Sequence, residues 1–273
     1  MLQDMLENVR RKAPLIHNIT NYVTVNDCAN IVLACGASPI MSDDIGEVEE
    51  ITSISAGLNI NIGTLNQRTL PAMLAAGKKA NELGHPVVLD PVGAGASSLR
   101  TASARKLLDE IRFTVIRGNI SEIRALASGT VSTRGVDADL SCRVTEENLD
   151  QAADFVKAFS RETGAVVAVT GAIDLVTDGD RVFCIRNGRP EMSRVTGTGC
   201  QLSAMTAAYV AANPKEPLTA AAAAVCAMGL CGEIAMGRMT PLDGNASYRN
   251  YIIDAVYHLT PEELERGARY EVR

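Results

Sequence analysis

Short runs of apolar, mostly β-branched residues alternate with longer amphipathic segments as far as Val169, and this alternation constrains the fold most strongly. The short runs have the length and composition of buried strands, and the longer segments have the apolar spacing of helices. Strands are expected at 39–41, 58–62, 87–89, 113–116 and 166–169, and helices at 70–83, 101–111, 120–128 and 145–162. Strands that alternate with helices form βαβ units, so the pattern predicts a mostly parallel central sheet with helices on both faces.

The rest of the chain departs from this alternation. Residues 174–188 carry Asp-Gly within alternating residues, which predicts a β-hairpin. After Gly199 the sequence is wholly helical in pattern, with helices expected at 200–212, 217–238, 245–259 and 261–269. No internal repeat, low-complexity tract or linker-like segment is present, so we expect one α/β domain over 1–273. Its helical C-terminal third should pack on the sheet.

The charge balance and the cysteines exclude several partners. The net charge is −6 and no five basic residues run together, which argues against nucleic acid and against a polybasic membrane anchor. The N-terminus lacks the basic-then-apolar order of a signal peptide, and we expect 220–236 to be too short and too weakly apolar to span a bilayer. None of the seven cysteines forms a C-x-x-C pair, so we expect reduced thiols and a cytoplasmic protein.

Two glycine-rich turns follow expected strand ends or precede an expected helix. They are D-P-V-G-A-G at 90–95 and V-T-G-T-G-C at 195–200. Ligands of open parallel sheets gather at the carboxyl ends of the strands, and a helix N-terminus presents free N–H groups to a phosphoryl group. Gly-Thr-Gly before a helix is also typical of a plain tight turn. The chain has neither a Walker A sequence nor a G-x-G-x-x-G motif.

Two acidic residues lie where a metal ion could be held. Asp90 ends a very apolar strand directly before a glycine turn, and Glu122 shares one face of a helical first turn with Asn119. Mg²⁺ takes a few oxygen ligands and keeps several waters, so a carboxylate at such a position can hold it through water. The alternative for Asn119 and Glu122 is an N-cap with its capping-box partner, and a turn led by proline also favours aspartate.

Taken together and in order, these segments resemble the ribokinase-like kinases. The matching motifs are N-x-x-E at 119–122, V-T-G at 169–171 and G-T-G at 197–199. Three further segments resemble the hydroxyethylthiazole kinase family of thiamine salvage: H-N-I-T-N-Y-V at 17–23, A-S-P-I-M-S at 37–42 and D-P-V-G-A-G at 90–95. The resemblance runs from about residue 12 to about residue 260. It implies a ribokinase-like three-layer sandwich that phosphorylates the hydroxyl of 4-methyl-5-(2-hydroxyethyl)thiazole with ATP and Mg²⁺.

The resemblance also implies roles for individual residues in binding. Arg117 and Thr170 match positions that contact ATP in the family, and a guanidinium fork and a hydroxyl suit phosphate oxygens. Met41 and Gly197 match the thiazole pocket. A thioether packs well against a flat heterocycle, and glycine lets the backbone approach a ligand closely. Asn21 is a candidate for binding the substrate hydroxyl.

The same resemblance assigns Asp90 and Glu122 to the magnesium side of the site, acting through water, and Cys200 to the proton chemistry. Most ribokinase-like enzymes carry aspartate after G-T-G as the base, whereas this chain carries cysteine, as some thiazole kinases do. Cys200 is then either an oriented, partly ionised base or only a hydrogen-bond partner of the hydroxyl. Phosphoryl transfer through a loose transition state needs positioning and charge neutralisation more than strong base catalysis. We expect His17 to be structural.

Two other functions stay open. A pyrimidine-alcohol kinase or a nucleotide-dependent hydro-lyase of the same fold would more naturally carry aspartate at position 200. A non-catalytic ligand sensor would have little need of the four phosphate-side residues Asp90, Glu122, Arg117 and Thr170. A homotrimer with substrate sites between subunits is implied by the resemblance alone.

Overall fold

A computed structural model of the protein describes residues 1–128 and 143–273. In this part of the chain the strands form one nine-stranded sheet with the order β2-β1-β3-β4-β5-β6-β7-β8-β9. The strands are β1 (Leu15–Ile19), β2 (Ser38–Met41), β3 (Gly57–Asn61), β4 (Val87–Asp90), β5 (Val115–Asn119), β6 (Val166–Thr170), β7 (Asp174–Thr177), β8 (Val182–Ile185) and β9 (Tyr270–Val272). Neighbours from β2 to β6 pair in parallel, whereas β7, β8 and β9 add an antiparallel edge.

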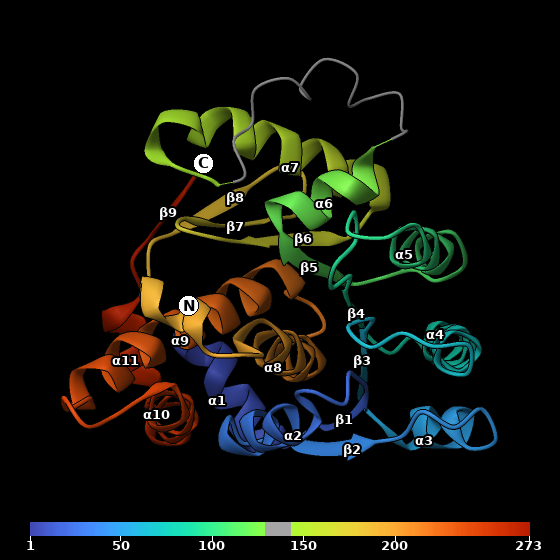
Figure 1. Ribbon diagram of the computed structural model, residues 1–273, viewed down its shortest axis with the longest axis horizontal. Helices are drawn as coiled ribbons and strands as arrows, with labels where there is room; N and C mark the ends of the chain where they lie inside the picture. Colours follow the sequence, from blue (N-terminus) through green and yellow to red (C-terminus); the bar gives the residue numbers. More distant parts are fainter. Residues whose placement is uncertain (129–142) are drawn as a thin grey trace.

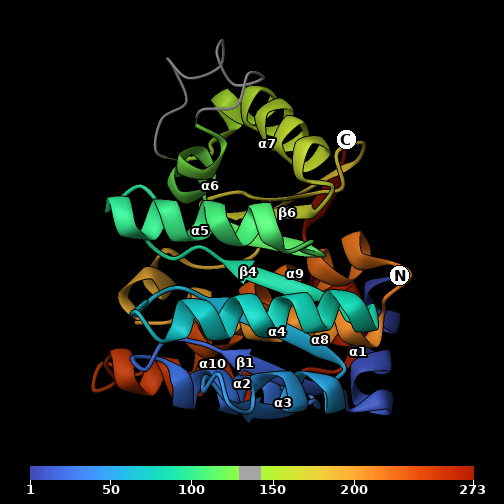
Figure 2. The same cartoon turned by 90° about the vertical axis from the view of Figure 1, so that its right-hand side faces the viewer.

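Helices cover both faces of the sheet, which gives the fold three layers (Figure 1). One layer consists of α3 (Val48–Ile54), α4 (Thr69–Leu83), α5 (Ser98–Glu110), α6 (Ile120–Ala127) and α7 (Leu149–Thr163). The opposite layer consists of α1 (Leu2–Lys12), α2 (Val25–Ala34), α8 (Thr198–Ala212), α9 (Pro217–Arg238), α10 (Asn245–His258) and α11 (Pro261–Gly267). Figure 2 looks onto the first layer, where α4 and α5 lie side by side in front of the sheet.

The opposite layer contains the most buried helices of the described chain. Helix α8 packs on β1, β3 and β4, while α9 packs on β6, β7 and β8. Residues Ala220–Ala224 of α9 are fully buried, as expected for a run of good helix formers that lets helices approach closely. These contacts hold the first turn of α8 in a fixed place relative to the strand ends.

Helix α9 corrects one expectation. Residues 220–236 were expected to be too short and too weakly apolar to span a bilayer, but the helix runs from Pro217 to Arg238 and is long and apolar enough by length and composition. Its placement argues against a membrane span, because 83% of its most apolar window is buried inside the fold. The helix is therefore explained as a core element.

Most of the expected elements are confirmed. The five strands, the hairpin of β7 and β8, and the helices between them are present, although β5 lies two to three residues later than expected. Strand β1 and helices α1 and α2 were not expected from the pattern. The prediction of a wholly helical end was wrong, because β9 returns to the sheet and pairs with β8. Its sequence Tyr-Glu-Val alternates as a strand does but is only three residues long, which is too short to predict a strand.

The cysteines agree with the expectation of reduced thiols as far as the structure describes them. Six of the seven are free and buried; Cys142 lies outside the described residues. Burial raises the pKa of Cys28 and of Cys35 to about 12, which makes these two thiols poor nucleophiles.

Candidate active site

The carboxyl ends of neighbouring parallel strands meet at one edge of the sheet, and most residues singled out by the sequence lie there. The register pairs Asn61 of β3 with Asp90 of β4, and Asn119 of β5 with Thr170 of β6. Helix α8 begins at the same edge, because Cys200 in its first turn contacts a side chain from the loop after β1. Segments far apart in the sequence therefore converge, as the strand order requires.

Asp90 lies at the centre of this edge and is fully buried. Its Oδ2 accepts hydrogen bonds from Asn61 Nδ2 (2.9 Å) and Ser203 Oγ (2.7 Å), and lies 3.6 Å from Arg117 Nη1. Its Oδ1 is buried without a hydrogen-bond partner in the described part of the chain. Burial raises the pKa of Asp90 to about 6, although the Arg117 guanidinium opposes this shift. A buried carboxylate with one unsatisfied oxygen is costly, which marks Asp90 as a functional candidate.

Arg117 connects Asp90 to the second predicted ATP contact. Its Nη2 donates a hydrogen bond to Thr170 Oγ1 at 2.5 Å, and its side chain is only 11% exposed. The guanidinium lies directly against the first turn of α8, where a Cβ added at Gly199 would lie 2.5 Å from Arg117 Nη1. Position 199 therefore needs glycine because a cation occupies the space that a side chain would fill.

Cys200 and Asn21, which are 179 positions apart in sequence, are in contact. Asn21 Nδ2 donates a hydrogen bond to Cys200 Sγ at 3.2 Å. Asn21 Oδ1 accepts from the backbone N–H (3.1 Å) and the hydroxyl (3.0 Å) of Thr24. Thr24 also lies under the turn before α8: Gly197 has φ +87°, and a Cβ there would lie 2.4 Å from Thr24 Cγ2. The predicted base and two predicted substrate contacts thus form one cluster.

Glu122 is held by hydrogen bonds to Asn119, in the first turn of its own helix, and to the glycine turn after β4. It forms a capping box with Asn119, because Glu122 Oε2 accepts from Asn119 N–H at 2.8 Å and Asn119 Oδ1 accepts from Glu122 N–H at 2.9 Å. Glu122 Oε1 accepts from the N–H of Gly93 at 2.8 Å, which ties α6 to the glycine turn after β4. The capping alternative is therefore confirmed as the local structure, and it leaves further lone pairs on both oxygens.

Met41 lies on β2 and His17 on the neighbouring strand β1. Met41 is half-buried at the end of β2 and packs against the apolar cluster that contains Cys200. It has no hydrogen bond to the polar cluster, as expected for a thioether. His17 is fully buried, with Nδ1 2.9 Å from Thr52 Oγ1 and Nε2 2.9 Å from the carbonyl oxygen of Ser42. Burial lowers the pKa of His17, which favours the neutral imidazole and agrees with the expected structural role.

A cleft of about 500 Å³ opens beside Arg117 and Thr170. Its walls come from the loop after β6, from η3 (Pro190–Arg194) with the loop before it, and from the first turn of α8 and the middle of α9. Thr198 and Gly199 line it, so the N-terminal N–H groups of α8 border the cleft. Its size suits a small organic molecule.

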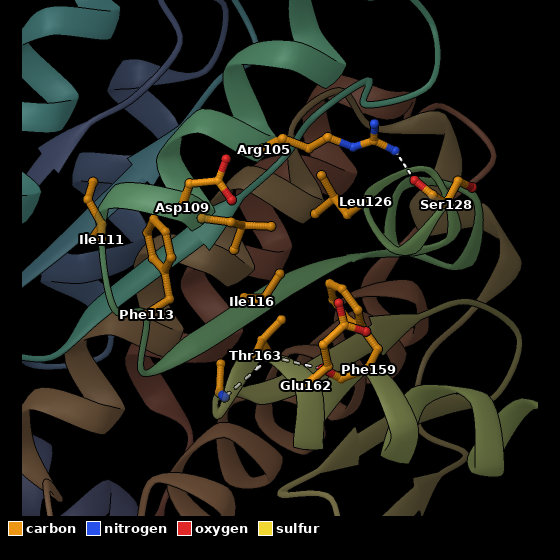
Figure 3. Close-up of a pocket in the computed structure, with 12 residues that line it drawn as sticks. Arg105, Asp109, Ile111, Phe113, Ile116, Leu126, Ser128, Phe159, Glu162 and Thr163 are labelled. Carbon is orange, nitrogen blue, oxygen red and sulfur yellow. Dashed lines mark hydrogen bonds between the residues drawn. The ribbon is translucent and has the colours of Figure 1, made fainter. Parts of the chain in front are cut away.

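A second hollow, of about 390 Å³, lies away from this edge, between α5 and α7. Figure 3 shows apolar side chains such as Phe113, Ile116 and Phe159 around it, with Arg105 reaching to the backbone oxygen of Ser128. None of the predicted site residues lines this hollow. Of the predicted site residues, Arg117 and Thr170 line the first cleft.

Sequence reasoning missed three polar residues of the site. Asn61 and Ser203 both donate to Asp90, and Asp174 lines the cleft with its Oδ1 accepting from Gly171 N–H at 2.8 Å. Burial raises the pKa of Asp174 to about 7. A signal existed for Asn61, because a polar side chain inside an otherwise apolar strand needs a buried partner.

The three-layer fold, the cleft at the carboxyl edge and the Arg117–Asp90 pair beside a helix N-terminus define a ribokinase-like small-molecule kinase. The fold is similar to a solved pyridoxal kinase from Staphylococcus aureus, with a TM-score of 0.62 at 16% identity over 95% of this chain and 98% of that chain. The hydroxyethylthiazole kinase family model matches residues 6–262, and the chain belongs to that family.

Individual relatives agree with this membership. The chain is 64% identical to a hydroxyethylthiazole kinase from Clostridium acetobutylicum over 271 residues, which cover 99% of each protein. Its structure is similar to that of a hydroxyethylthiazole kinase from Pyrococcus horikoshii, with a TM-score of 0.88 at 36% identity over 100% of this chain and 98% of that chain. The expectation of family and fold is confirmed.

Proposed function

We propose that the protein, as a single kinase domain, transfers the terminal phosphoryl group of ATP to the hydroxyl of 4-methyl-5-(2-hydroxyethyl)thiazole. The product is the thiazole phosphate used in thiamine biosynthesis and salvage. The observation that carries this proposal is the contact of Asn21 Nδ2 with Cys200 Sγ, 3.2 Å apart, at the helix tip that borders the cleft. The membership of the family supports the choice of alcohol.

The polar groups divide into a nucleotide side and an alcohol side. Arg117 and Thr170 line the cleft, where a guanidinium and a hydroxyl bind phosphate oxygens. The free N–H groups at the start of α8 favour the negative charge that spreads over a transferring phosphoryl group. On the alcohol side, Cys200, held in place by Asn21, orients the hydroxyl, and in its thiolate form the sulfur accepts the hydroxyl proton late. The protein therefore acts by positioning and by charge neutralisation.

The residues present fit a magnesium ion that is held mainly by phosphate and water. Asp90 Oδ1 is an unsatisfied buried acceptor next to Arg117, and Glu122 keeps lone pairs for a metal-bound water. No cluster of three or more His, Cys, Asp or Glu residues is present in residues 1–128 and 143–273, as suits Mg²⁺, which seldom occupies an all-protein cage. When bound, Mg²⁺ would neutralise charge on the phosphates of ATP.

The proposal includes a homotrimer in which a neighbouring subunit completes the thiazole pocket near Met41 and Gly197. Strand β2 is an edge strand, and edges of this kind are usually covered or paired. Large apolar side chains are exposed on segments near it: Tyr22, Val23, Leu33, Ile45 and Ile54. Sedimentation velocity of the purified protein tests this part. A monomer at assay concentration would contradict it.

Incubation of the pure protein with Mg-ATP and a panel of thiazole and pyrimidine alcohols tests the function. ADP release and the mass of the phosphate ester should identify the hydroxyethylthiazole as the best acceptor. Arg117→Met should abolish turnover, while Arg112→Met, at an exposed arginine before β5, should leave it unchanged. Phosphorylation of a pyrimidine alone would favour the rival kinase, and ATP binding without turnover would favour a sensor.

The negative net charge and the buried α9 support a cytoplasmic protein without nucleic acid or membrane partners.

A further inference from the structure

A buried amide connects the two sides of the site. Asn61, at the end of β3, is 1% exposed, and every polar atom of its side chain is hydrogen-bonded. Its Nδ2 donates to Asp90 Oδ2 at 2.9 Å, while its Oδ1 accepts from Asn21 Nδ2 at 3.1 Å and from the N–H of Gly63 at 2.9 Å. A backbone N–H can only donate, so Gly63 fixes which end of the Asn61 amide is oxygen.

This fixed amide determines how Asn21 is held. Asn21 Nδ2 has two hydrogens, of which one goes to Asn61 Oδ1 and the other to Cys200 Sγ. The Asn21 oxygen is held at its other end by the two donors of Thr24. If the Asn61 acceptor is lost, one hydrogen of Asn21 Nδ2 has no partner in a site where an unpaired donor is costly. The amide would then move away from the sulfur to find another acceptor.

We propose that Asn61 is a positioning residue that clamps the Asn21 amide against the Cys200 thiol and couples it to Asp90 on the phosphate side. This inference rests on the proposed phosphorylation of the thiazole alcohol. Its physical basis is that the reacting hydroxyl must be held close to its transfer position, and a displacement of about 1 Å can cost as much as a hundredfold in rate. Asn61 touches neither ATP nor the alcohol in this scheme and acts through Asn21.

The chain offers a matched control for Asn61 on the same strand. Asn59 lies two residues earlier and therefore faces the same side of β3, and it is also fully buried. Its Nδ2 donates to Asn18 Oδ1 at 3.1 Å, so it belongs to a separate pair. Asn59→Ser should cost stability as Asn61→Ser does, without any effect on the Asn21–Cys200 contact.

The test compares kcat and the two KM values of Asn61→Ser and Asn59→Ser, together with a double-mutant cycle on Asn21. We expect Asn61→Ser to lower kcat about tenfold, with the KM for Mg-ATP changed less than about twofold, and Asn59→Ser to leave both unchanged. In the Asn21→Ala background, Asn61→Ser should lower kcat much less, because the action that passes through the Asn21 amide is already lost and only the hydrogen bond to Asp90 remains to be removed. If Asn61→Ser does not fold, Asn61→Thr, which suits a strand, should give the same pattern.

An equal loss from Asn59→Ser, or the same tenfold factor with and without Asn21, would overturn the inference. Wild-type protein that phosphorylates no thiazole alcohol would instead overturn the proposed function. These two failures are distinguishable because the first is measured only on an active wild type.

Discussion

Gly199→Ala is the sharpest test of the cleft, because it should separate activity from stability. Gly199 lies in the first turn of α8, and alanine in a helix is favoured over glycine by about 1 kcal/mol. Yet the new Cβ would lie 2.5 Å from Arg117 Nη1 and 3.1 Å from Arg117 Cζ. Contact distances between carbon and other heavy atoms are about 3.5 Å, so the guanidinium must move by about 1 Å.

That movement breaks the hydrogen bond from the charged Arg117 to Thr170, at a cost of about 1.5–3 kcal/mol, which the gain in helix propensity offsets only in part. We therefore expect a fall of only a few degrees in melting temperature, about 2–4 °C per kcal/mol, and a loss of about a hundredfold in kcat/KM for Mg-ATP. Gly237→Ala is the matched control, since Gly237 is a glycine of α9 whose added Cβ would meet nothing within 4 Å. It should raise the melting temperature by about 2–4 °C and leave kcat/KM unchanged.

Calorimetry and a coupled ADP assay at varied ATP measure both quantities. If Gly199→Ala kept kcat/KM within about threefold of wild type, Arg117 would not need its position under the helix. A large fall in melting temperature with proportional loss of active protein would equally refute the reasoning.

Substitutions at three further positions test other parts of the site. Cys200→Ala should lower kcat more than it raises KM, whereas Cys200→Asp should keep or raise turnover; equal kcat for alanine and wild type would remove the thiol from the chemistry. Gly197→Ala should lower the free energy of unfolding by about 2–4 kcal/mol in urea titrations, since φ is +87° and Thr24 fills the space; no change would contradict this. Burial raises the pKa of Asp174 to about 7, so the folded state keeps a proton that the unfolded chain releases from about pH 4 upward. On this account the stability of the wild type falls between pH 4 and pH 7. The melting temperature of Asp174→Asn minus that of the wild type should therefore rise across that range. A difference that does not change with pH would contradict the raised pKa of Asp174.

Local patterns in the sequence were sufficient to predict most strands of the sheet and most helices. Apolar runs such as 87–89 and 166–169 gave β4 and β6 because consecutive apolar residues suit strands covered on both faces. Strand β1 was missed because its sequence Leu-Ile-His-Asn-Ile has two polar residues at its centre. Those side chains are buried by partners outside the strand, such as Thr52 for His17, which the local pattern cannot reveal.

Most individual residues of the candidate site were predicted, but the hydrogen bonds between them were not. Asp90 was predicted because it lies at a strand end before a glycine turn, whereas Arg117, Thr170 and Cys200 were predicted from the resemblance to the kinase family. Whether these residues act as proposed stays a prediction. Asn61 was missed because a polar residue in an apolar strand signals a buried partner without showing that the partners are Asp90 and Asn21.

The sequence by itself determined most of the alternating strands and helices, the glycine turns and the residue types available for phosphoryl transfer, because these depend on neighbours within a few positions. Only the tertiary structure decided that Asn61 joins Asp90 to Asn21, and that Asn21 meets Cys200, over separations of 29, 40 and 179 residues. The physical reason is that such hydrogen bonds form only after the parallel register aligns the strand ends and α8 packs across them. Neither the alignment of the strand ends nor the packing of α8 can be predicted from a short stretch of sequence.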